Sequence, residues 1–571
     1  MRCKLLTVGQ MERGVPGRVS VARVILRAAL LICVVWLPAK SVLAVSCSVQ
    51  EHSAPSKADK ALAGADYEEA ASLYRAGLAD HAGDAELTVG LVHALLHQQK
   101  IQDATDAVKA ALAATPNSAA LITLRGEVEL RQGTPWIAEQ SAIEAARLDP
   151  CNPRAHLLLA NLAHIDSLYA TSRKQLEIAH QLDPEDAEIR GLWIRTLTLQ
   201  ERIRETEAYL SAPRGEDEVD LFRWRLYLAN LKKMAGEPHK ACHLVSPAAG
   251  TEIPIAAYMH DPLHIAAYGV EAKVNGHNAR LEIDTGTGGL VVSHSLAKHA
   301  HLKAFSRTEM FGVGDQGGQS GYTAYADSIR VGNLEFHDCA VRVLDSKSGL
   351  EEVDGLIGMD VFSHFLVTLD YPRRKLLLAP LPPRPEEADS RAPSQKTGDE
   401  EREDAEARAA AQNGADHESD AADLYDRYIA PEMKSYTPVY RVDNLVMLPA
   451  TLNGKIVRLF AMDTGAMNTT ISPEAASEVT KVRSSFGFNV KGINGKVENV
   501  YAADEITFTF AHVSQKVQSV VSFNLSKLSK DTGMEISGFL GANTLDQLTI
   551  HIDYRDGLVK FDYDPKRGDR P

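Results

Sequence analysis

The N-terminal half of the chain has the pattern of a series of short helices. Residues 57–245 are rich in Ala, Leu, Glu and Gln and poor in Gly, a composition that favours helix. Aromatic or branched, small and proline positions recur here at intervals of 34 residues or a multiple of 34. They are Tyr67, Ile101 and Tyr169; Ala70, Ala104 and Ala138; Gly77, Ala111, Ala145 and Ala179; and Pro116, Pro150 and Pro184. We expect each proline to close one pair of helices before the next pair begins.

This period, with small residues where helices approach and proline at the end of the unit, resembles the tetratricopeptide repeat (TPR). The resemblance implies an all-α TPR-like solenoid over 57–245, with four clear units and a degenerate fifth that reaches about Cys242. Such arrays form a concave surface that binds peptides or another protein. A generic helical bundle is the alternative interpretation, and neither fold carries catalytic chemistry of its own.

Beyond Gly250 the pattern changes to short β-rich runs separated by Gly and Asn. Asn275-Gly276 and Asn453-Gly454 each predict a tight hairpin turn. The second strand of each hairpin ends at an Asp-Thr-Gly sequence. The Gly of the turn precedes the Asp by eight residues in the first copy and by nine in the second, so we expect a bulge in one of them.

In two places, therefore, an apolar strand is followed by an aspartate at the start of a turn. The two stretches are Leu281-Glu282-Ile283-Asp284-Thr285-Gly286-Thr287 and Phe460-Ala461-Met462-Asp463-Thr464-Gly465-Ala466. Burying a carboxylate is costly in free energy. Two aspartates that both follow apolar strands therefore suggest that their carboxylates form a pair. Each copy continues with a Gly-bearing segment and then with two apolar residues before a Gly. These are Gly312-Val313-Gly314 and Gly492-Ile493-Asn494-Gly495, followed by Leu356-Ile357-Gly358 and Phe539-Leu540-Gly541.

This ordered set of features, present twice, resembles the retropepsin-type aspartic protease unit. The resemblance implies two all-β lobes, at 255–380 and 437–565, that form a pepsin-like bilobed unit within one chain. A third Asp-Thr-Gly, at 531–533, follows a polar run and no strand, and we interpret it as a loop.

The resemblance also implies a chemistry for Asp284 and Asp463. Two carboxylates about 3 Å apart cannot both ionise, so the pair shares a proton. The ionised member takes a proton from water, and the protonated member polarises the carbonyl of a peptide bond. This reaction needs neither a metal nor a cofactor, and we expect none.

Neighbouring residues have supporting roles that the resemblance implies. Gly286 and Gly465 would turn the backbone so that its N–H groups face the carboxylates. Thr285 and Thr464 would form hydrogen bonds to the opposite lobe. From the difference between the two copies we also predict that the Thr287 hydroxyl, where the second copy has Ala466, favours ionisation of Asp284 and a proton on Asp463. The remaining glycines would lie in mobile flaps: Gly312, Gly314, Gly492 and Gly495.

The first 44 residues have the features of a secretory signal peptide. Arginines precede an apolar core at 28–37, and Val42-Leu43-Ala44 resembles a cleavage site. We therefore expect an exported protein, periplasmic or secreted. The alternatives are an uncleaved N-terminal membrane anchor and a lipid on Cys47. No other stretch of the sequence is apolar enough to span a membrane.

Charge and cysteine content bear on the partners of the protein and on the segment between the two lobes. The net charge of −15 argues against a nucleic-acid partner. Much of it lies in residues 381–426, where 386–426 alone holds fourteen acidic and four basic residues. This Pro-rich, acidic segment predicts a solvated linker, with an acidic binding arm as the alternative. The four cysteines after residue 44 are too widely spaced to predict a disulfide framework or a zinc site.

The interpretation that we favour is an aspartic endopeptidase, a hydrolase whose repeats recruit a protein substrate or partner. A catalytically silent scaffold that retains the protease fold and binds peptides is the alternative. Within the enzyme class, lobes that pair between two chains are a further alternative. The sequence identifies neither the substrate nor the ligand of the repeats.

Overall fold

The computed structural model describes residues 47–50, 55–211, 218–236, 242–246, 250–262, 264–310, 312–345, 350–385, 425–484, 487 and 489–563. The predicted signal peptide at 1–44 and most of the predicted linker lie outside these residues. Within them, no helix has both the length and the apolar character needed to cross a membrane.

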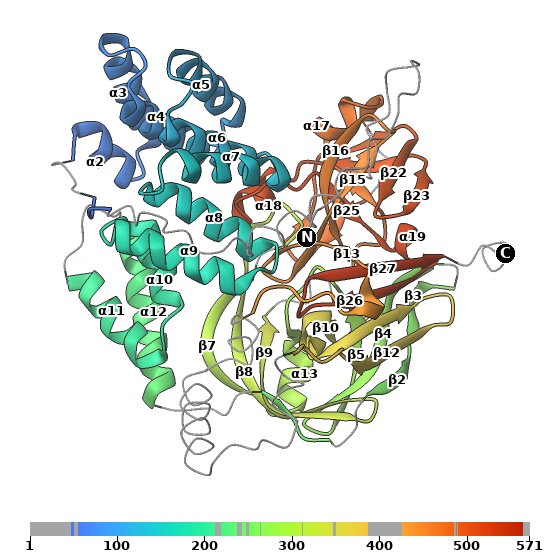
Figure 1. The fold of residues 1–571 in the computed structure, drawn as a ribbon. Helices are drawn as coiled ribbons and strands as arrows, with labels where there is room; N and C mark the ends of the chain where they lie inside the picture. The colour runs from blue at the N-terminus through green and yellow to red at the C-terminus, as the bar shows by residue number, and fades with distance from the viewer. Residues whose placement is uncertain are drawn as a thin grey trace, which may run out of the picture. The chain divides into compact units, whose positions relative to one another are not determined.

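The N-terminal part of the described chain is a succession of antiparallel helices (Figure 1). The helices are α2 (Lys57–Ala63), α3 (Tyr67–Asp80), α4 (Ala85–His97), α5 (Ile101–Ala114), α6 (Ala119–Arg131), α7 (Pro135–Leu148), α8 (Pro153–Ile165), α9 (Tyr169–Leu182), α10 (Ala187–Arg195), α11 (Leu199–Ser211) and α12 (Glu218–Gly236). Pro116, Pro150 and Pro184 each lie in a loop between two of them. The helical repeat region predicted from the sequence is therefore confirmed.

Local sequence explains where these helices begin and how closely they pack. Side chains of Asp66, Asp84, Ser118, Asn152 and Asp186 accept hydrogen bonds from backbone N–H groups of the first helical turn. The recurring small residues allow close approach, and Ala70, Ala104 and Ala138 are completely buried. Helix α4 contacts α6, and α6 contacts α8, so alternate helices stack along one side of the array.

The β-rich part contains two similar sheets, one for each lobe (Figure 1). Lobe 1 comprises β1 (His243–Leu244), β2 (Thr251–Pro254), β3 (Ala256–Asp261), β4 (His264–Val274), β5 (His277–Ile283), β6 (Leu290–Ser293), α13 (His294–His299), β7 (Lys303–Met310), β8 (Gln319–Val331), β9 (Leu334–Leu344), β10 (Gly355–Ile357), η1 (Met359–Phe362), β11 (Phe365–Asp370) and β12 (Lys375–Pro380). Its main sheet has the order β1-β9-β6-β10-β5-β4-β8-β7, with β3 added to β4.

Lobe 2 repeats this plan. It comprises η2 (Pro431–Met433), β13 (Thr437–Pro438), β14 (Tyr440–Val442), β15 (Leu445–Leu452), β16 (Ile456–Met462), β17 (Thr470–Ile471), α17 (Pro473–Ser477), β18 (Val482–Ser484), β19 (Lys491–Gly492), β20 (Gly495–Lys496), β21 (Val500–Ala503), β22 (Ile506–Phe510), β23 (Val513–Val517), β24 (Val520–Phe523), α18 (Ser526–Asp531), β25 (Gly538–Leu540), α19 (Ala542–Leu545), β26 (Leu548–Asp553) and β27 (Leu558–Tyr563). The main sheet has the order β18-β21-β24-β17-β25-β16-β15-β22-β23, with β14 added to β15.

A third sheet joins the lobes. Its order is β13-β27-β26-β11-β12-β2, so strands of lobe 2 and lobe 1 pair at its centre. Strand β11 runs antiparallel to β26, from Leu366 opposite Asp553 to Asp370 opposite Thr549. One hydrophobic core of buried residues extends through both lobes and this shared sheet.

The hairpin turns explain the extra residue in the second copy. Asn275 and Gly276 both have positive φ, as a two-residue turn of this kind requires. In the second copy Leu452 pairs with Ile456, so Lys455 is added to the turn after Asn453 and Gly454. The additional residue therefore lies in the hairpin turn.

Two features differ from what the sequence suggested. The helices end at Gly236, and β1 at 243–244 belongs to the sheet of lobe 1 rather than to the repeats. Cys242 and Cys339 form a disulfide across 97 residues, which their spacing did not reveal. The third Asp-Thr-Gly, interpreted as a loop, begins at Asp531, the last residue of α18, and continues into the turn that follows, where Gly533 has a φ of 71°.

Candidate active site

Two parallel strand pairs hold the aspartates of the repeated motif. Strand β5 ends at Ile283 and pairs in parallel with β10, and the Asp284 N–H donates to the Ile357 carbonyl at 3.1 Å. In lobe 2, β16 pairs in the same way with β25, and the Asp463 N–H donates to the Leu540 carbonyl at 3.0 Å. The apolar pairs before Gly358 and Gly541 thus belong to the strands that fix the ends of the aspartate-bearing strands.

The threonines of the two motifs link the lobes. The Thr285 N–H donates to Thr464 Oγ1, and the Thr464 N–H donates to Thr285 Oγ1, both at 3.1 Å. Each hydroxyl in turn donates to a carbonyl of the other lobe, Thr285 to Met462 at 2.8 Å and Thr464 to Ile283 at 2.9 Å. Both side chains are almost fully buried, so these four hydrogen bonds are shielded from water.

The two aspartate side chains lie close together beside this link, because the Cβ position of Gly286 is 3.0 Å from Asp463 Cγ and 3.1 Å from Asp284 Oδ1. The glycines of the motif are needed for this approach. A Cβ on Gly286 would lie 3.0 Å from Asp463 Cγ, and one on Gly465 would lie 2.7 Å from Asp284 Cγ. Side chains larger than hydrogen at these positions would collide with the carboxyl group of the opposite lobe.

Hydrogen bonds to the two carboxyl groups are unequal. Asp284 Oδ1 accepts from the N–H groups of Gly286 at 2.7 Å and Thr287 at 3.1 Å, and its Oδ2 accepts from the Thr287 hydroxyl at 2.6 Å. Asp463 Oδ1 accepts from Gly465 and Ala466, both at 3.0 Å. Asp284 therefore has one more donor than Asp463 has among the described residues.

The unequal number of hydrogen-bond donors gives the two carboxyl groups different pKa values. Burial, together with the neighbouring Asp284 carboxylate, raises the pKa of Asp463 to about 8. Burial also raises the pKa of Asp284, but the hydrogen bonds from Thr287 and Gly286 act in the opposite direction. The arrangement favours a proton on Asp463 and a negative charge on Asp284.

The two Gly-bearing segments touch each other. The residues between β7 and β8 form one tip, and those between β19 and β20 form the other. The Asn494 N–H donates to the Val313 carbonyl, and the Gln316 N–H donates to the Asn494 carbonyl, both at 3.0 Å. Val313 packs on an apolar cluster of lobe 2, and Ile493 on an apolar cluster of lobe 1. Each tip thus contacts the wall of the opposite lobe.

The glycines predicted for the flaps lie at this contact. A Cβ on Gly314 would be 2.3 Å from the Asn494 backbone, one on Gly492 would be 2.5 Å from the Val313 carbonyl, and one on Gly495 would be 2.4 Å from the Gln316 side chain. Gly312 lies near Ile493 with more room. The sequence offers two aromatic residues near the first flap: Phe311 is outside the described residues, and Tyr322 lies on β8 with its ring against His294.

Sequence reasoning missed two polar residues beside the dyad. The Asn444 side chain donates to the Gly286 carbonyl at 3.0 Å, and Asp360 accepts from the Gly289 N–H at 2.9 Å. Burial raises the pKa of Asp360. Both residues stand outside the repeated motifs, so only their three-dimensional position reveals them. No group of three or more His, Cys, Asp or Glu side chains in the described ranges is arranged to hold a metal ion.

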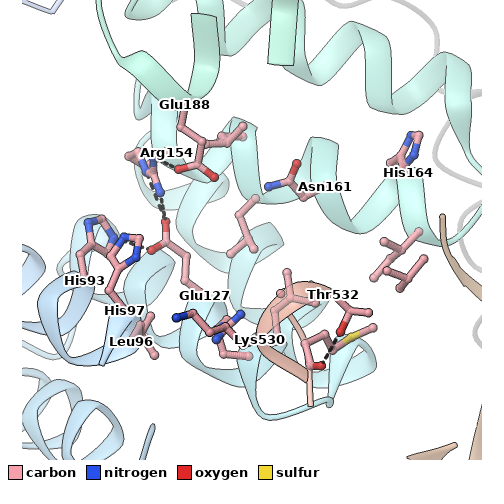
Figure 2. Close-up of a pocket in the computed structure, with 18 of the residues that line it drawn as sticks. His93, Leu96, His97, Glu127, Arg154, Asn161, His164, Glu188, Lys530 and Thr532 are labelled. Atoms are coloured by element: carbon pink, nitrogen blue, oxygen red, sulfur yellow. Dashed lines mark hydrogen bonds and ion pairs between the residues drawn. The ribbon is translucent and has the colours of Figure 1, made fainter. Parts of the chain in front are cut away.

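A cavity of about 530 Å³ lies between the helices and lobe 2 (Figure 2). Helices α4, α6, α8 and α10 line one side, and the residues around Thr532 line the other. Figure 2 shows Glu127 between His93 and Arg154, with Nε2–Oε2 and Nη2–Oε1 distances of 2.8 and 2.9 Å. The lining also includes Arg131 and Lys530, neither of which forms an ion pair with a described residue.

Several contacts hold this boundary together. The Glu535 N–H donates to the Arg131 carbonyl at 3.0 Å, and Gly133 has so little room that a Cβ would be 2.4 Å from the Glu535 carbonyl. Leu130, Trp136 and Ile165 pack on the same apolar cluster of lobe 2 that receives Val313. The third Asp-Thr-Gly is therefore part of a boundary between the helices and lobe 2.

Comparisons with known proteins match the helical part and the β-rich part of the chain separately. A family model described as aspartyl protease matches residues 270–361, and one described as tetratricopeptide repeat matches residues 61–128. No curated protein matches the chain. Solved structures that match include a thermophilic TPR protein of Thermus thermophilus, with 21% identity and a TM-score of 0.24, covering 29% of this chain and 90% of that one.

The aspartic proteinase of Irpex lacteus matches with 13% identity and a TM-score of 0.35, covering 56% of this chain and 99% of that one. Both TM-scores are low, so the description of the two parts of the chain rests on the family models and not on these structures. The chain joins tetratricopeptide repeats to a β-rich region that contains an aspartyl protease domain.

Proposed function

We propose that the protein is an aspartic endopeptidase in which Asp284 and Asp463 activate one water molecule. The observation that supports the proposal is the proximity of the two carboxyl groups, one from each lobe, on either side of Gly286 and Gly465. Ionised Asp284 accepts a proton from the water, while protonated Asp463 donates a hydrogen bond to the carbonyl oxygen of the peptide bond. Two coupled carboxyl groups suffice for this chemistry, and the touching flap tips would exclude other water during the reaction.

Single asparagine variants test the proposal. Asp284→Asn and Asp463→Asn each remove one member of the dyad with little change in size, and we expect each to abolish cleavage of an unfolded protein substrate. Asp531→Asn is the matched control, because it changes the third Asp-Thr-Gly, outside the dyad. If either dyad variant keeps half of the wild-type rate, a single shared site is wrong.

A silent scaffold with the same fold is the other candidate. The raised pKa values of the dyad weigh against it, since a peptide-binding cleft has no need of two buried carboxyl groups held in contact. The same assay separates the two functions. A scaffold would bind unfolded protein without cleaving it at any pH between about 1.5 and 9, a range that includes the values of about 1.5 and 4.7 known for such pairs and the pKa of about 8 of Asp463.

We also propose that the cavity between the helices and lobe 2 receives an acidic group of a protein substrate or partner. Arg131 donates to Gln99 at 3.1 Å, but its buried Nε has no partner among the described residues. Lys530 faces the same cavity from lobe 2. A carboxylate placed between these two cations would gain charge-assisted hydrogen bonds without displacing an existing ion pair.

Peptide affinity of the full chain tests this second role. Arg131→Gln and Lys530→Gln should each weaken binding of an acidic fluorescent peptide about tenfold, the value expected for one charge-assisted hydrogen bond. Binding of the same peptide with Asn and Gln in place of Asp and Glu should not change. Lys109→Gln, on an exposed face of α5, is the control. Equal affinity of all variants for the acidic peptide would contradict the proposal.

A further inference from the structure

A third carboxyl group, that of Glu282, lies on β5 two residues before Asp284. Along β5 the exposure alternates, since Leu281 and Ile283 are completely buried while Glu282 and Asp284 are half-buried. Successive side chains of a strand point to opposite faces. Glu282 and Asp284 therefore share the face of β5 that is turned away from the core of lobe 1.

Neighbours on this face offer Glu282 no partner. Glu282 is paired with Gly269 of β4 and with Leu356 of β10, and residues paired in this way have side chains on the same face. Glycine has no side chain, and leucine cannot hydrogen-bond to a carboxylate. Within the described part of the chain, no hydrogen bond or ion pair reaches the Glu282 carboxyl group.

Glu282 lies two residues before Asp284 on the same face, so the charges of the dyad act on it. Burial, followed by the charges of Asp284 and Asp463, raises the pKa of Glu282 well above its ordinary range. A half-buried carboxyl group beside two others is unfavourable in its ionised form. A cation brought by a ligand would relieve that repulsion, whereas an apolar ligand side chain would not.

The matching position of lobe 2 has the opposite character. Ala461 stands two residues before Asp463, and its paired neighbours are Met447 and Phe539. Ala461 is completely buried within an apolar cluster. The lobe 1 side of the dyad thus carries a half-buried carboxyl group at the position where the lobe 2 side carries a fully buried apolar residue.

We propose that Glu282 binds a lysine or arginine side chain of the substrate next to the peptide bond that is cleaved. The inference rests on the proposed endopeptidase function and assigns the substrate class as polypeptides with a basic residue on one side of that bond. An ion pair between the substrate cation and Glu282 would form beside the dyad, on a side chain that is half-buried and to which water has limited access. Charge-assisted hydrogen bonds in such a place are stronger than those on an exposed surface.

Two peptides that differ at one position test this specificity. One carries Lys beside the scissile bond and the other carries Met, which has similar length but no charge. We expect wild-type kcat/KM to favour the Lys peptide about tenfold or more, as one charge-assisted contact predicts. Glu282→Gln should lose this preference and cleave the Met peptide at a similar rate. Glu271→Gln, an exposed acid on the neighbouring strand, should retain the preference.

Other outcomes separate the two proposals. If wild type and Glu282→Gln show the same ratio of kcat/KM for the two peptides, Glu282 does not select the substrate. An equal fall in kcat for both peptides would mean that Glu282 acts on the dyad alone, which also overturns the inference. If wild type cleaves neither peptide, the endopeptidase function fails. The Kd values of both peptides for wild type and Glu282→Gln then decide whether Glu282 binds the basic side chain.

Discussion

The Thr287 hydroxyl donates a 2.6 Å hydrogen bond to Asp284 Oδ2, while Ala466 occupies the matching position beside Asp463. Two otherwise similar motifs thus differ by one donor. The hydrogen bond stabilises the ionised form of Asp284, because a carboxylate accepts it more strongly than a neutral acid does. One residue outside the Asp-Thr-Gly sequence therefore distinguishes the two members of the dyad.

We predict that Thr287→Ala shifts the acid limb of the pH–rate profile. Loss of the hydroxyl raises the pKa of Asp284, so activity should begin at a pH higher by about one unit, the value that corresponds to one hydrogen bond of roughly 1.4 kcal/mol. The alkaline limb, set by Asp463 with its pKa of about 8, should move less. Measurement of kcat/KM from acid to alkaline pH gives both limbs.

The reciprocal variant is the control for this shift. Ala466→Thr offers Asp463 the hydroxyl that it lacks, which lowers the pKa of Asp463 and moves the alkaline limb to lower pH. A profile that Thr287→Ala leaves unchanged would reject the role of the hydroxyl.

Removal of one threonine hydroxyl at the link between the lobes should destabilise the protein. Thr285→Val loses the hydrogen bond to the Met462 carbonyl and leaves the Thr464 N–H without its acceptor. Unpaired buried groups cost about 1–3 kcal/mol each. We expect a loss of about 2–4 kcal/mol in the free energy of unfolding, measured by urea denaturation. Thr507→Val, on β22, should change it by less than about 0.5 kcal/mol.

Contact between the flap tips should depend on Gly314. This residue has a φ of 130°, and a Cβ would lie 2.3 Å from the Asn494 backbone. Gly314→Ala should separate the tips and lower kcat/KM by up to about 100-fold, as expected for a displaced positioning element. Hydrogen exchange at the Asn494 amide should become faster.

Gly317→Ala isolates the effect of the contact. Gly317 also has a positive φ, 80°, but no described atom lies within 4 Å of the position of its Cβ. The two variants thus share the backbone penalty and differ in the collision. Equal exchange rates at Asn494 in both would show that the tips do not depend on this contact.

Gly133→Ala should loosen the helices from lobe 2. Gly133 has a φ of 69° and faces the Glu535 carbonyl, whereas Gly83 has a φ of 86° and faces only the Ala114 methyl group at 3.6 Å among the described residues. Gly83→Ala is therefore a control with similar backbone strain inside the repeats. We expect faster proteolysis at 530–535 in Gly133→Ala than in Gly83→Ala, and similar rates would contradict the contact.

Stability should fall as the pH rises towards neutrality because of Asp553. Burial, with the charge of Asp556, raises the pKa of Asp553 to about 7, and its Oδ2 has no partner among the described residues. Between about pH 4 and 7 the folded protein holds a proton that the unfolded chain releases, so the free energy of unfolding decreases with pH. One such group contributes a slope of at most about 1.4 kcal/mol per pH unit.

Asp553→Asn should therefore flatten this dependence. Urea unfolding at about pH 5, 6, 7 and 8 measures the slope across the titration of this group, and exposed Asp327→Asn serves as the control. A variant that follows the wild-type slope would contradict the assignment to Asp553.

The sequence predicted the helices and the order of the β-rich units because both depend on local, repeated patterns. Small residues at a 34-residue period mark helix contacts, and Asn-Gly marks each hairpin wherever the chain lies in space. The Cys242–Cys339 disulfide, by contrast, joins residues 97 positions apart, and β1 pairs with β9, which is similarly distant in the sequence. No local pattern contains that information.

The residues of the candidate site likewise fall into those that a local motif predicts and those that only tertiary packing reveals. Asp284 and Asp463 stand in a repeated motif, so their pairing follows from symmetry. Glu282 stands within that motif but was not predicted as a site residue, although the alternation of the strand places it on the face of Asp284. Asn444 and the boundary at 530–535 reach their neighbours through tertiary packing, which the motif does not encode.

The sheet in which β11 pairs with β26 has a consequence for how the dyad is assembled. A homodimer of single units would have to form its site by collision, so its specific activity would fall on dilution. Here the halves are covalently tethered and share backbone hydrogen bonds, so site formation is a first-order folding event that is independent of protein concentration. Because the two halves have different sequences, their matching positions can also carry different residues, which identical subunits do not allow.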